Sequence, residues 1–301
     1  MITLYPPPAL SLHVAYKQKN KLSGRKRPFT SRQVTLETQQ VMDGGLSSQA
    51  WRALDLLAAG GALDLNRLGV TDRTMRNWAS SFLTDRIQVD RVELQAKYDE
   101  IGLTGISTYL YTLGPVGREI AAQRHGQAFP GIYHGWRLDR ILHDLVANEI
   151  VFRLAEAFGA QGWAVQWVGA HECALMDAKT QTAILTPGGL LHCRKDDGQK
   201  QTYLLEYHNE DGAIHATKKA REYQSAFESG VWKKQWKVET FPPVLTVFQD
   251  VRVGDGYKQA ARSGASCRFY GKTLKAVLEG KIHEWVFIAD TARRDVLIPQ
   301  E

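Results

Sequence analysis

Residues 71–83 read TDRTMRNWASSFL and predict a helix, Asp72 to Leu83, whose two faces differ in chemistry. Thr71 is a good N-cap, because a threonine side-chain oxygen accepts a hydrogen bond from the first turn of a helix. The apolar residues recur at helical spacing and are expected to face a core: Met75, Trp78, Ala79 and Phe82. The other face is polar and basic, and it carries Arg73, Arg76, Asn77 and Ser80. This second face can meet DNA.

The segments on either side of this helix predict the rest of a small domain. A helix is expected over residues 47–59, and a short helical segment over 62–68 ends at Gly69. After the central helix, two extended runs, 87–94 and 106–113, are expected to form a hairpin, and a polar stretch containing Lys97 separates them. Gly114-Pro115 then precedes a helix over 116–123.

Three helices, a hairpin and a closing helix are the order of a winged helix-turn-helix, which we expect over residues 45–126. In such a domain one helix reads base edges in the major groove and the wing contacts phosphate or the minor groove. Arg73 and Arg76 are therefore candidates for guanine or phosphate contacts, and Lys97 is a candidate in the wing. The alternative is a helical adaptor whose arginines are only solvated.

The segment before this domain is strongly basic. Residues 1–36 contain no Asp or Glu, and their basic residues are Lys17, Lys19, Lys21, Arg25, Lys26, Arg27 and Arg32. These seven charges exceed the net charge of +6 for the whole chain, so the remainder sums to about −1. We expect residues 1–44 to be a flexible tail in which Arg25, Lys26 and Arg27 attract DNA without reading its sequence. A solubilising or processed tail is the alternative.

Composition narrows the class of protein. The chain has 301 residues, a length that favours two domains. Of these residues 44% are hydrophobic and 23% charged, as is typical of a folded protein. Collagen-like, coiled-coil and wholly disordered chains are excluded. No run of about 18 apolar residues and no signal-peptide pattern occurs, so we expect a cytoplasmic protein without a membrane partner. The three cysteines form no CxxC pair, which disfavours a disulfide framework.

The second half of the chain alternates helix and strand signals. A linker is expected over 127–136, followed by a helix from Leu138 to Phe158 that ends at Gly159. Strand patterns follow at 164–168, 182–185, 190–193, 202–207 and 244–248, with a helix at 216–229. These elements predict a mixed sheet flanked by helices over residues 137–301, and so an α/β fold class, mixed α+β overall.

Five short motifs in this half carry a resemblance. They are His143-Asp-Leu-Val-Ala-Asn148, Leu185-Thr-Pro-Gly-Gly-Leu190, Tyr203-Leu-Leu-Glu206, Lys219-Ala-Arg-Glu-Tyr223 and Phe241-Pro-Pro-Val244. Their order and spacing, with the winged helix in front, resemble the replication-relaxation family over about residues 45–290. The resemblance implies action on plasmid or other mobile-element DNA, and a second domain similar to the restriction-endonuclease fold.

The resemblance also implies where nuclease chemistry would lie. Such a site holds a divalent metal with carboxylates and places a lysine near the attacking water. Here Pro187 is followed by Gly188 in place of an aspartate, and Glu206 is followed two residues later by His208. Glu206 therefore remains, with Glu149 as a possible accessory ligand and Lys219 as a source of positive charge. The alternative is structural: Glu206 pairs with Lys219, and Tyr223 packs on the sheet.

Other chemistry is disfavoured. His171 and Cys173 could join His192 and Cys193 in a zinc site, but alternation along a strand puts His192 and Cys193 on opposite faces. No nucleophile elbow and no phosphate-binding loop occur in the sequence.

We therefore expect a DNA-binding protein of a plasmid or other mobile element that acts in replication, mobilisation or its control. Its partners are double-stranded DNA and a replication or mobilisation enzyme complex, and its nuclease-like domain serves binding or assembly without a cofactor. One alternative is a metal-dependent nuclease or nicking enzyme that uses Glu206 with Mg²⁺ or Mn²⁺. Another is an adaptor that recruits a different nucleic-acid enzyme.

Overall fold

The computed structural model describes residues 30–129, 136–177, 179–180, 182–210, 212–262 and 266–298. The chain divides into two compact units, and the division falls between Leu145 and Val146 in one long helix, α7 (Leu138–Ala160). We call the described residues up to Leu145 the N-terminal unit and those from Val146 the C-terminal unit. Both units combine helices with β-sheet, which confirms the predicted fold class. None of the described helices has the length and apolar character that a bilayer span requires.

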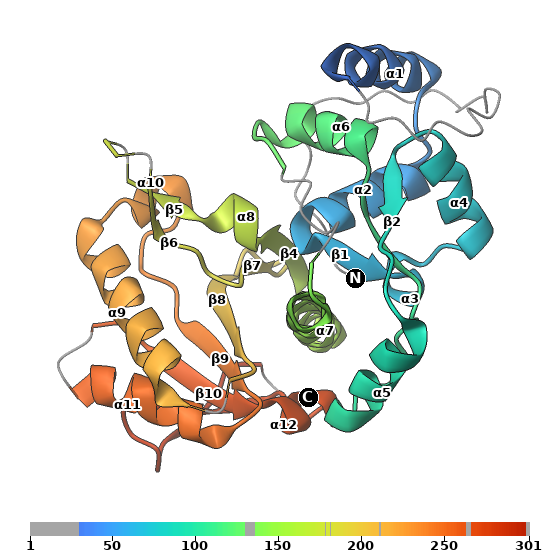
Figure 1. The fold of residues 1–301 in the computed structure, drawn as a ribbon. Coiled ribbons are helices and arrows are strands. Elements are labelled where there is room, and N and C mark those ends of the chain that lie inside the picture. Colours follow the sequence, from blue (N-terminus) through green and yellow to red (C-terminus); the bar gives the residue numbers. More distant parts are fainter. Residues whose placement is uncertain are drawn as a thin grey trace. The chain divides into compact units, whose positions relative to one another are not determined.

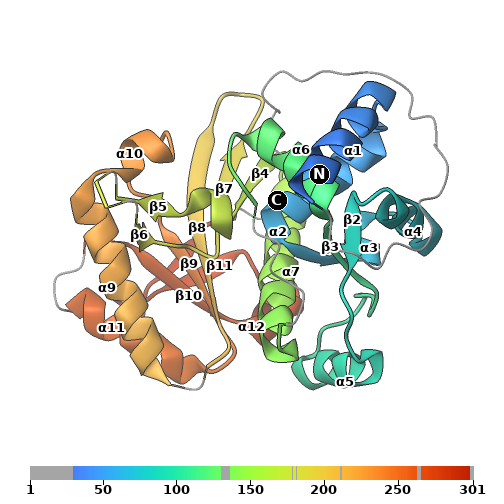
Figure 2. The same ribbon diagram turned by 45° about the horizontal axis from the view of Figure 1, so that its top comes forward.

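The N-terminal unit is built on a three-stranded antiparallel sheet in the order β1-β3-β2, which contacts α2, α4 and α6 (Figure 2). Its elements are α1 (Ser31–Gly44), α2 (Ser48–Gly60), β1 (Ala62–Asp64), α3 (Leu65–Leu68), α4 (Asp72–Ser80), β2 (Thr84–Arg86), α5 (Arg91–Ile101), β3 (Leu110–Leu113) and α6 (Pro115–His125). The helical segment predicted over 62–68 forms only as α3 over its last four residues, and its first three residues form β1, because Ala62 and Asp64 pair with Thr112 and Leu110.

The prediction of a flexible tail over residues 1–44 is wrong for residues 31–44, which form helix α1. Thr30 and Gln33 cap its start reciprocally, each side chain accepting a hydrogen bond from the other residue's amide. Thr38 and Val41 are buried, and α1 packs on α6. Two buried positions are too few to give a helical pattern in the sequence. Residues 1–29, with Arg25, Lys26 and Arg27, lie outside the described residues.

The predicted hairpin is also corrected. Its first strand, β2, lies before the expected run 87–94, its second, β3, covers only the last four residues of the run 106–113, and helix α5 lies in the connection between them (Figure 2). The Asp90 side chain caps α5 by accepting hydrogen bonds from two amides of its first turn. Leu94 and Tyr98, one helical turn apart, are the buried residues of α5. The run 87–94 was expected as a strand because its apolar residues alternate at the start, before the helical period begins.

The C-terminal unit contains a seven-stranded mixed sheet in the order β12-β11-β10-β9-β8-β7-β4 (Figure 1). Strands β8, β9 and β10 are parallel, and the other neighbours are antiparallel. The strands are β4 (Ala164–Gly169), β7 (Gly189–Arg194), β8 (Lys200–His208), β9 (Val244–Phe248), β10 (Phe269–Thr273), β11 (Glu284–Phe287) and β12 (Arg294–Val296). A small separate sheet pairs β5 (Leu175–Met176) with β6 (Ala183–Leu185).

Helices cover both faces of the large sheet. Besides α7 they are α8 (Ala170–Cys173), α9 (Ala213–Ser229), α10 (Trp232–Gln235), η1 (Val251–Val253), α11 (Gly254–Arg262) and α12 (Leu274–Leu278). Helix α7 packs on the face that carries Tyr203, whose ring centre lies 5.6 Å from that of Phe158. Helices α9 and α11 pack together on the opposite face, which carries Leu204, Glu206 and His208 (Figure 1). Successive side chains of β8 point to opposite faces of the sheet, so Tyr203 lies on one face while Glu206 and His208 lie on the other.

Candidate functional site

Helix α4 presents the polar face that the sequence predicts. The Thr71 hydroxyl caps it by accepting a hydrogen bond from the Thr74 amide at 3.2 Å. Met75 is fully buried and anchors the inner side of the helix. Four polar residues of α4 are exposed: Arg73, Arg76, Asn77 and Ser80.

The end of α4 differs from the prediction, because the helix stops at Ser80 instead of Leu83. Phe82 has a left-handed φ of 59°, so the chain turns sharply there. The turn lets the Phe82 carbonyl accept hydrogen bonds from the amides of Val116 and Gly117, at 3.0 and 3.3 Å. The end of α4 is thereby fixed to the start of α6.

The exposed side chains of α4 differ in how firmly they are held. Arg76 Nε lies 2.9 Å from Asp72 Oδ2, and the Tyr111 hydroxyl donates to Asp72 Oδ1 at 2.7 Å. The Ser80 hydroxyl donates to the Asn77 carbonyl at 2.7 Å, so its proton is already engaged. Arg73 forms no ion pair within the described part of the chain. Its guanidinium is the cation of α4 that is available to a ligand.

Lys97 does not lie in an extended wing. It is on α5, where its ammonium group pairs with Glu100 at 2.9 Å. This hydrogen bond and the charge of Glu100 raise the pKa of Lys97. The pairing weakens the case for Lys97 as a contact to DNA, because its charge is partly balanced.

A second cationic group was missed by the sequence analysis. Arg86 of β2 and Arg91 of α5 both lie over the ring of Tyr109, with guanidinium carbons 4.6 and 4.9 Å from its centre. Arg91 also donates a hydrogen bond to the Tyr109 hydroxyl at 2.7 Å. We call these three residues the wing cluster. No local pattern links them, because pairing of β2 with β3 brings the segments together.

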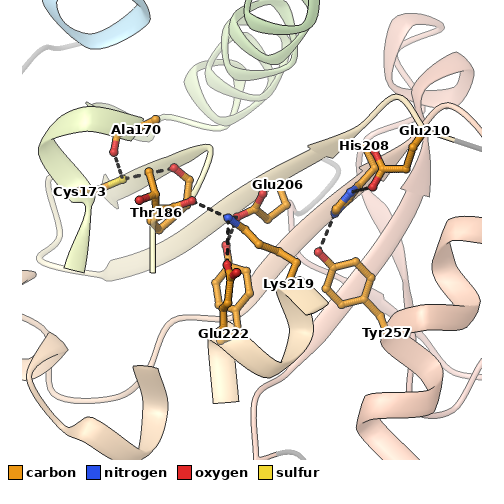
Figure 3. Close-up of polar contacts among 11 residues, drawn as sticks. Ala170, Cys173, Thr186, Glu206, His208, Glu210, Lys219, Glu222 and Tyr257 are labelled. Carbon is orange, nitrogen blue, oxygen red and sulfur yellow. Dashed lines mark hydrogen bonds and ion pairs between the residues drawn. The ribbon is translucent and has the colours of Figure 1, made fainter. Parts of the chain in front are cut away.

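In the C-terminal unit, Glu206 lies on the face of β8 that is covered by α9 (Figure 3). The Tyr223 hydroxyl donates to Glu206 Oε1 at 2.6 Å, and Lys219 Nζ lies 3.3 Å from the same oxygen. Lys219 also donates to the Thr186 carbonyl at 2.6 Å and lies 3.8 Å from Glu222. Burial and the charge of Glu206 raise the pKa of Tyr223, which keeps this hydroxyl protonated as a donor. The predicted pair of Glu206 and Lys219 is therefore present, and the Tyr223 hydroxyl adds a second contact to the same carboxylate oxygen.

His208 follows Glu206 on the same face but is occupied on both sides of its ring. Its Nδ1 hydrogen-bonds with Glu210 Oε1 and its Nε2 with the Tyr257 hydroxyl, each at 2.7 Å (Figure 3). The side chain is only 6% exposed. A metal ligand needs a ring nitrogen with a free lone pair, and this network engages both nitrogens.

Gly188 lies in a position that admits no carboxylate. The antiparallel register pairs Gly189 with Leu205, which places Gly188 opposite Glu206 at the start of β7. A Cβ atom at residue 188 would lie 2.9 Å from the Leu205 carbonyl oxygen, closer than real Cβ contacts. The backbone here is built for glycine, so an aspartate would require the strand to move. The residues present therefore do not fit the metal site that the restriction-endonuclease fold implies.

Glu149 does not join this group. It lies on α7, buried at 1% exposure, and Arg153 Nε donates to its Oε1 at 2.7 Å. Helix α7 packs on the face of the sheet opposite to the one that carries Glu206. The expected grouping of Glu149 with Glu206 therefore does not form. Distance along the chain does not reveal the face of the sheet on which a helix packs.

The cysteine and histidine pairs do not form a metal centre. His171 and Cys173 lie in the short helix α8, and the Cys173 thiol donates to the Ala170 carbonyl at 3.7 Å. His192 Nδ1 hydrogen-bonds with the Thr202 hydroxyl at 3.1 Å, and burial raises the pKa of the Cys193 thiol to about 12. Among the described residues, no three His, Cys, Asp or Glu side chains are grouped so that they could hold a metal.

Comparison with known proteins leaves the family open. The chain matches no family model, and no curated protein or solved structure shows significant similarity to it. Membership of the replication-relaxation family therefore stays a prediction.

Proposed function

We propose that this protein binds double-stranded DNA and that helix α4 reads it. The proposal depends above all on one observation: a helix anchored by buried Met75 exposes Arg73, Arg76 and Asn77 together. An α-helix fits the major groove of B-DNA, and arginine and asparagine make the commonest bidentate contacts to guanine and adenine there. The order α2, β1, α3, α4, β2 and β3, with α5 inserted between the last two strands, also resembles a winged helix-turn-helix, in which the third helix reads DNA.

Within α4 we assign different roles to the two arginines. Arg73 is free of ion pairs among the described residues and would contact a guanine edge. Arg76 is oriented along the helix by Asp72, which Tyr111 fixes in turn, and would contact phosphate or an adjacent base. Asn77, one turn after Arg73, would read a neighbouring base pair.

The wing cluster supports the same function. Arg86 and Arg91 are held against the Tyr109 ring, which restricts their side chains before any ligand binds. Guanidinium groups contact phosphate oxygens bidentately, so the cluster is suited to the DNA backbone. We assign it backbone contacts that position the protein without reading sequence.

The C-terminal unit is proposed to serve binding or assembly. Gly188, the engaged His208 and the position of Glu149 leave Glu206 without the second carboxylate that the restriction-endonuclease pattern requires. The buried contacts of Glu206 to Lys219 and Tyr223 stabilise the packing of α9 on the sheet. Action on a plasmid or other mobile element, in replication, mobilisation or its control, is proposed from the family resemblance.

Replacing Arg73 by Ala is expected to weaken binding to the preferred duplex by about 1–3 kcal/mol, because a bidentate base contact is lost. The duplex is selected from a random-sequence library with the full chain, and affinity is measured by fluorescence anisotropy. Arg73→Lys keeps the charge but not the planar fork, so it should bind almost as weakly as Arg73→Ala. Lys275→Ala, at an exposed position of α12, is the control and should bind like the wild type. Unchanged affinity of an Arg73→Ala/Arg76→Ala variant would exclude α4 as the reading helix.

Replacing Arg86 and Arg91 together by Ala is expected to weaken binding to every duplex by a similar factor. Each phosphate contact that is lost should reduce the slope of log affinity against log salt by about 0.9. Titrations of the selected duplex and a scrambled duplex at several salt concentrations measure both effects. A loss of affinity confined to the selected duplex would mean that the wing cluster reads bases instead.

The second candidate function is metal-dependent cleavage, and the contact between Glu206 and Lys219 is the observation that favours it. These residue types match the acid and the lysine of a restriction-endonuclease site. The missing carboxylate at Gly188 argues against it, because a metal and its charge supply much of the transition-state stabilisation in phosphodiester hydrolysis.

We expect no cleavage or nicking of supercoiled or linear DNA by the purified protein in Mg²⁺ or in Mn²⁺. Agarose gels of plasmid DNA after incubation with a molar excess of protein measure this outcome. Cleavage that is present in the wild type and absent in Glu206→Gln would establish the nuclease function. Cleavage that persists in Glu206→Gln would instead indicate a contaminating enzyme.

A further inference from the structure

The C-terminal unit contains a pocket of about 860 Å³ that the proposed function does not use. It lies over strands β10 and β11, and η1, α11 and α12 supply residues to its walls. This volume is in the range of sites that bind small molecules, about 300–1,000 Å³. Glu206 does not line the pocket, whereas Phe248, whose ring centre lies 6.1 Å from that of His208, does.

The floor of the pocket is apolar. Phe248, Val286 and Ile288 line it, together with Gly271 between them. A side chain at Gly271 would lie 2.9 Å from the Phe248 ring and 3.3 Å from Ile288, so glycine keeps this part of the floor open. An apolar floor in an open pocket favours a ligand with an aromatic or aliphatic body.

The walls carry more positive than negative charge. The basic residues that line the pocket are Lys258, Lys272, Lys281 and Arg294, against two acidic residues, Asp255 and Glu284. Lys281 pairs with Glu279, and the Lys272 ammonium donates to the Lys281 carbonyl and lies 5.4 Å from the centre of the Trp285 ring. Neither Lys258 nor Arg294 forms an ion pair with any residue that the structure describes.

The ammonium group of Lys272 is already engaged by the Lys281 carbonyl and the Trp285 ring, so it is not the cation that a ligand would meet. Burial lowers the pKa of Lys272, the negative charge of Glu284 raises it, and the positive charge of Arg294 has a smaller lowering effect. Lys258 is half-buried on α11, where an ammonium group without an anion is unfavourable. An anion in the pocket would pair with Lys258 and Arg294, the two lining cations that form no ion pair among the described residues.

We propose that this pocket binds a small organic anion, in which an aromatic or aliphatic body joins a phosphate or carboxylate group. The apolar body lies on Phe248, Val286 and Ile288, and the anionic group contacts Lys258 and Arg294. The proposal concerns a ligand other than DNA, and it holds whether or not α4 reads a duplex.

The test uses the full chain and 8-anilinonaphthalene-1-sulfonate, a fluorescent probe that joins an aromatic body to a single anionic group. We expect one saturable site per chain. Lys258→Glu and Arg294→Glu should each raise the dissociation constant about tenfold or more, because a charge-assisted contact becomes a repulsion. Lys275→Glu is the matched control: it makes the same change in charge on α12 outside the pocket, and it should leave the dissociation constant unchanged.

Two further measurements separate the pocket from other apolar surface. N-phenyl-1-naphthylamine, which lacks the sulfonate, should bind the wild type and Lys258→Glu equally. Val286→Trp fills the floor and should weaken both probes, with unchanged circular dichroism as evidence of folding. Displacement of the anionic probe by adenosine 5′-monophosphate or by indole-3-acetate would assign the ligand group as phosphate or carboxylate. Equal binding of the anionic probe by Lys258→Glu, Arg294→Glu and the wild type, or displacement by neither competitor, would overturn the proposal.

Discussion

Replacing Asp55 by Ala is expected to lower the local stability of α2 and α6 by about 3–5 kcal/mol. Asp55 accepts hydrogen bonds from Arg124 Nε and Nη2 at 2.8 and 2.9 Å, and it lies 3.3 Å from His125 Nε2. Both partners of the main pair are buried, with side-chain exposures of 9% and 8%. The Arg124 guanidinium also lies 4.5 Å from the centre of the Trp51 ring. Removal of the carboxylate would leave a guanidinium buried without an anion.

Hydrogen exchange of the amides of α2 and α6, followed by mass spectrometry, measures this loss in the full chain. The control is Glu100→Ala, which breaks the exposed pair with Lys97 and should leave exchange unchanged. The double variant Asp55→Ala/Arg124→Met removes both charges, so it should lose less stability than Asp55→Ala alone. If the amides of α2 and α6 exchange no faster in Asp55→Ala than in Glu100→Ala, the buried pair does not stabilise the contact between these two helices.

Replacing Gly117 by Ala is expected to destabilise the N-terminal unit by at least about 2 kcal/mol. A Cβ atom at residue 117 would lie 2.0 Å from the Leu83 carbonyl oxygen and 3.2 Å from Leu54 Cδ2. The Leu83 carbonyl belongs to the backbone and cannot rotate away as a side chain would. The first turn of α6 and the Leu83 carbonyl must therefore move apart. Because Leu83 follows α4 closely in the chain, the exposed face of α4 would shift as well.

Gly44 provides a matched control in another helix of the same unit. A Cβ atom at residue 44 would meet nothing within 4 Å, and its helical backbone suits alanine. Gly44→Ala should therefore be neutral or stabilise α1 by about 0.4–1 kcal/mol. Thermal unfolding by circular dichroism, with hydrogen exchange of α4 and α6, compares the two variants. Equal stability of Gly117→Ala and Gly44→Ala would show that the close approach at Leu83 is relieved at little cost.

Helix α4 could be predicted from the sequence because a cap and an apolar repeat lie within a few residues of each other. Thr71, Met75 and the exposed Arg73 occupy the positions that the helical period assigns to them. The same holds for Glu206 and Lys219, since strand alternation and the following helix place them on one face. The end of α4 at Ser80 was not predicted, because it depends on hydrogen bonds from Val116 and Gly117, which are distant in sequence.

Helices α1 and α5 show why local pattern was insufficient elsewhere in the chain. Each buries only two residues, Thr38 and Val41 in α1 and Leu94 and Tyr98 in α5, so neither produces a strong apolar repeat. Their caps, at Thr30 and Asp90, are the local signals that could have identified them. Both caps consist of common polar residues that also occur in turns.

The sequence by itself determined the α/β class, the polar face of α4, the strands around Glu206 and the absence of an aspartate at residue 188. These features depend on residue type and on periods of two or 3.6 residues, which act over short distances along the chain. Only the tertiary structure decided that Glu149 lies across the sheet from Glu206, that Arg86 and Arg91 share the Tyr109 ring, and that cations surround an apolar pocket. Each of these depends on strand pairing or helix packing between distant segments, and a local pattern does not specify which distant segment a face will meet.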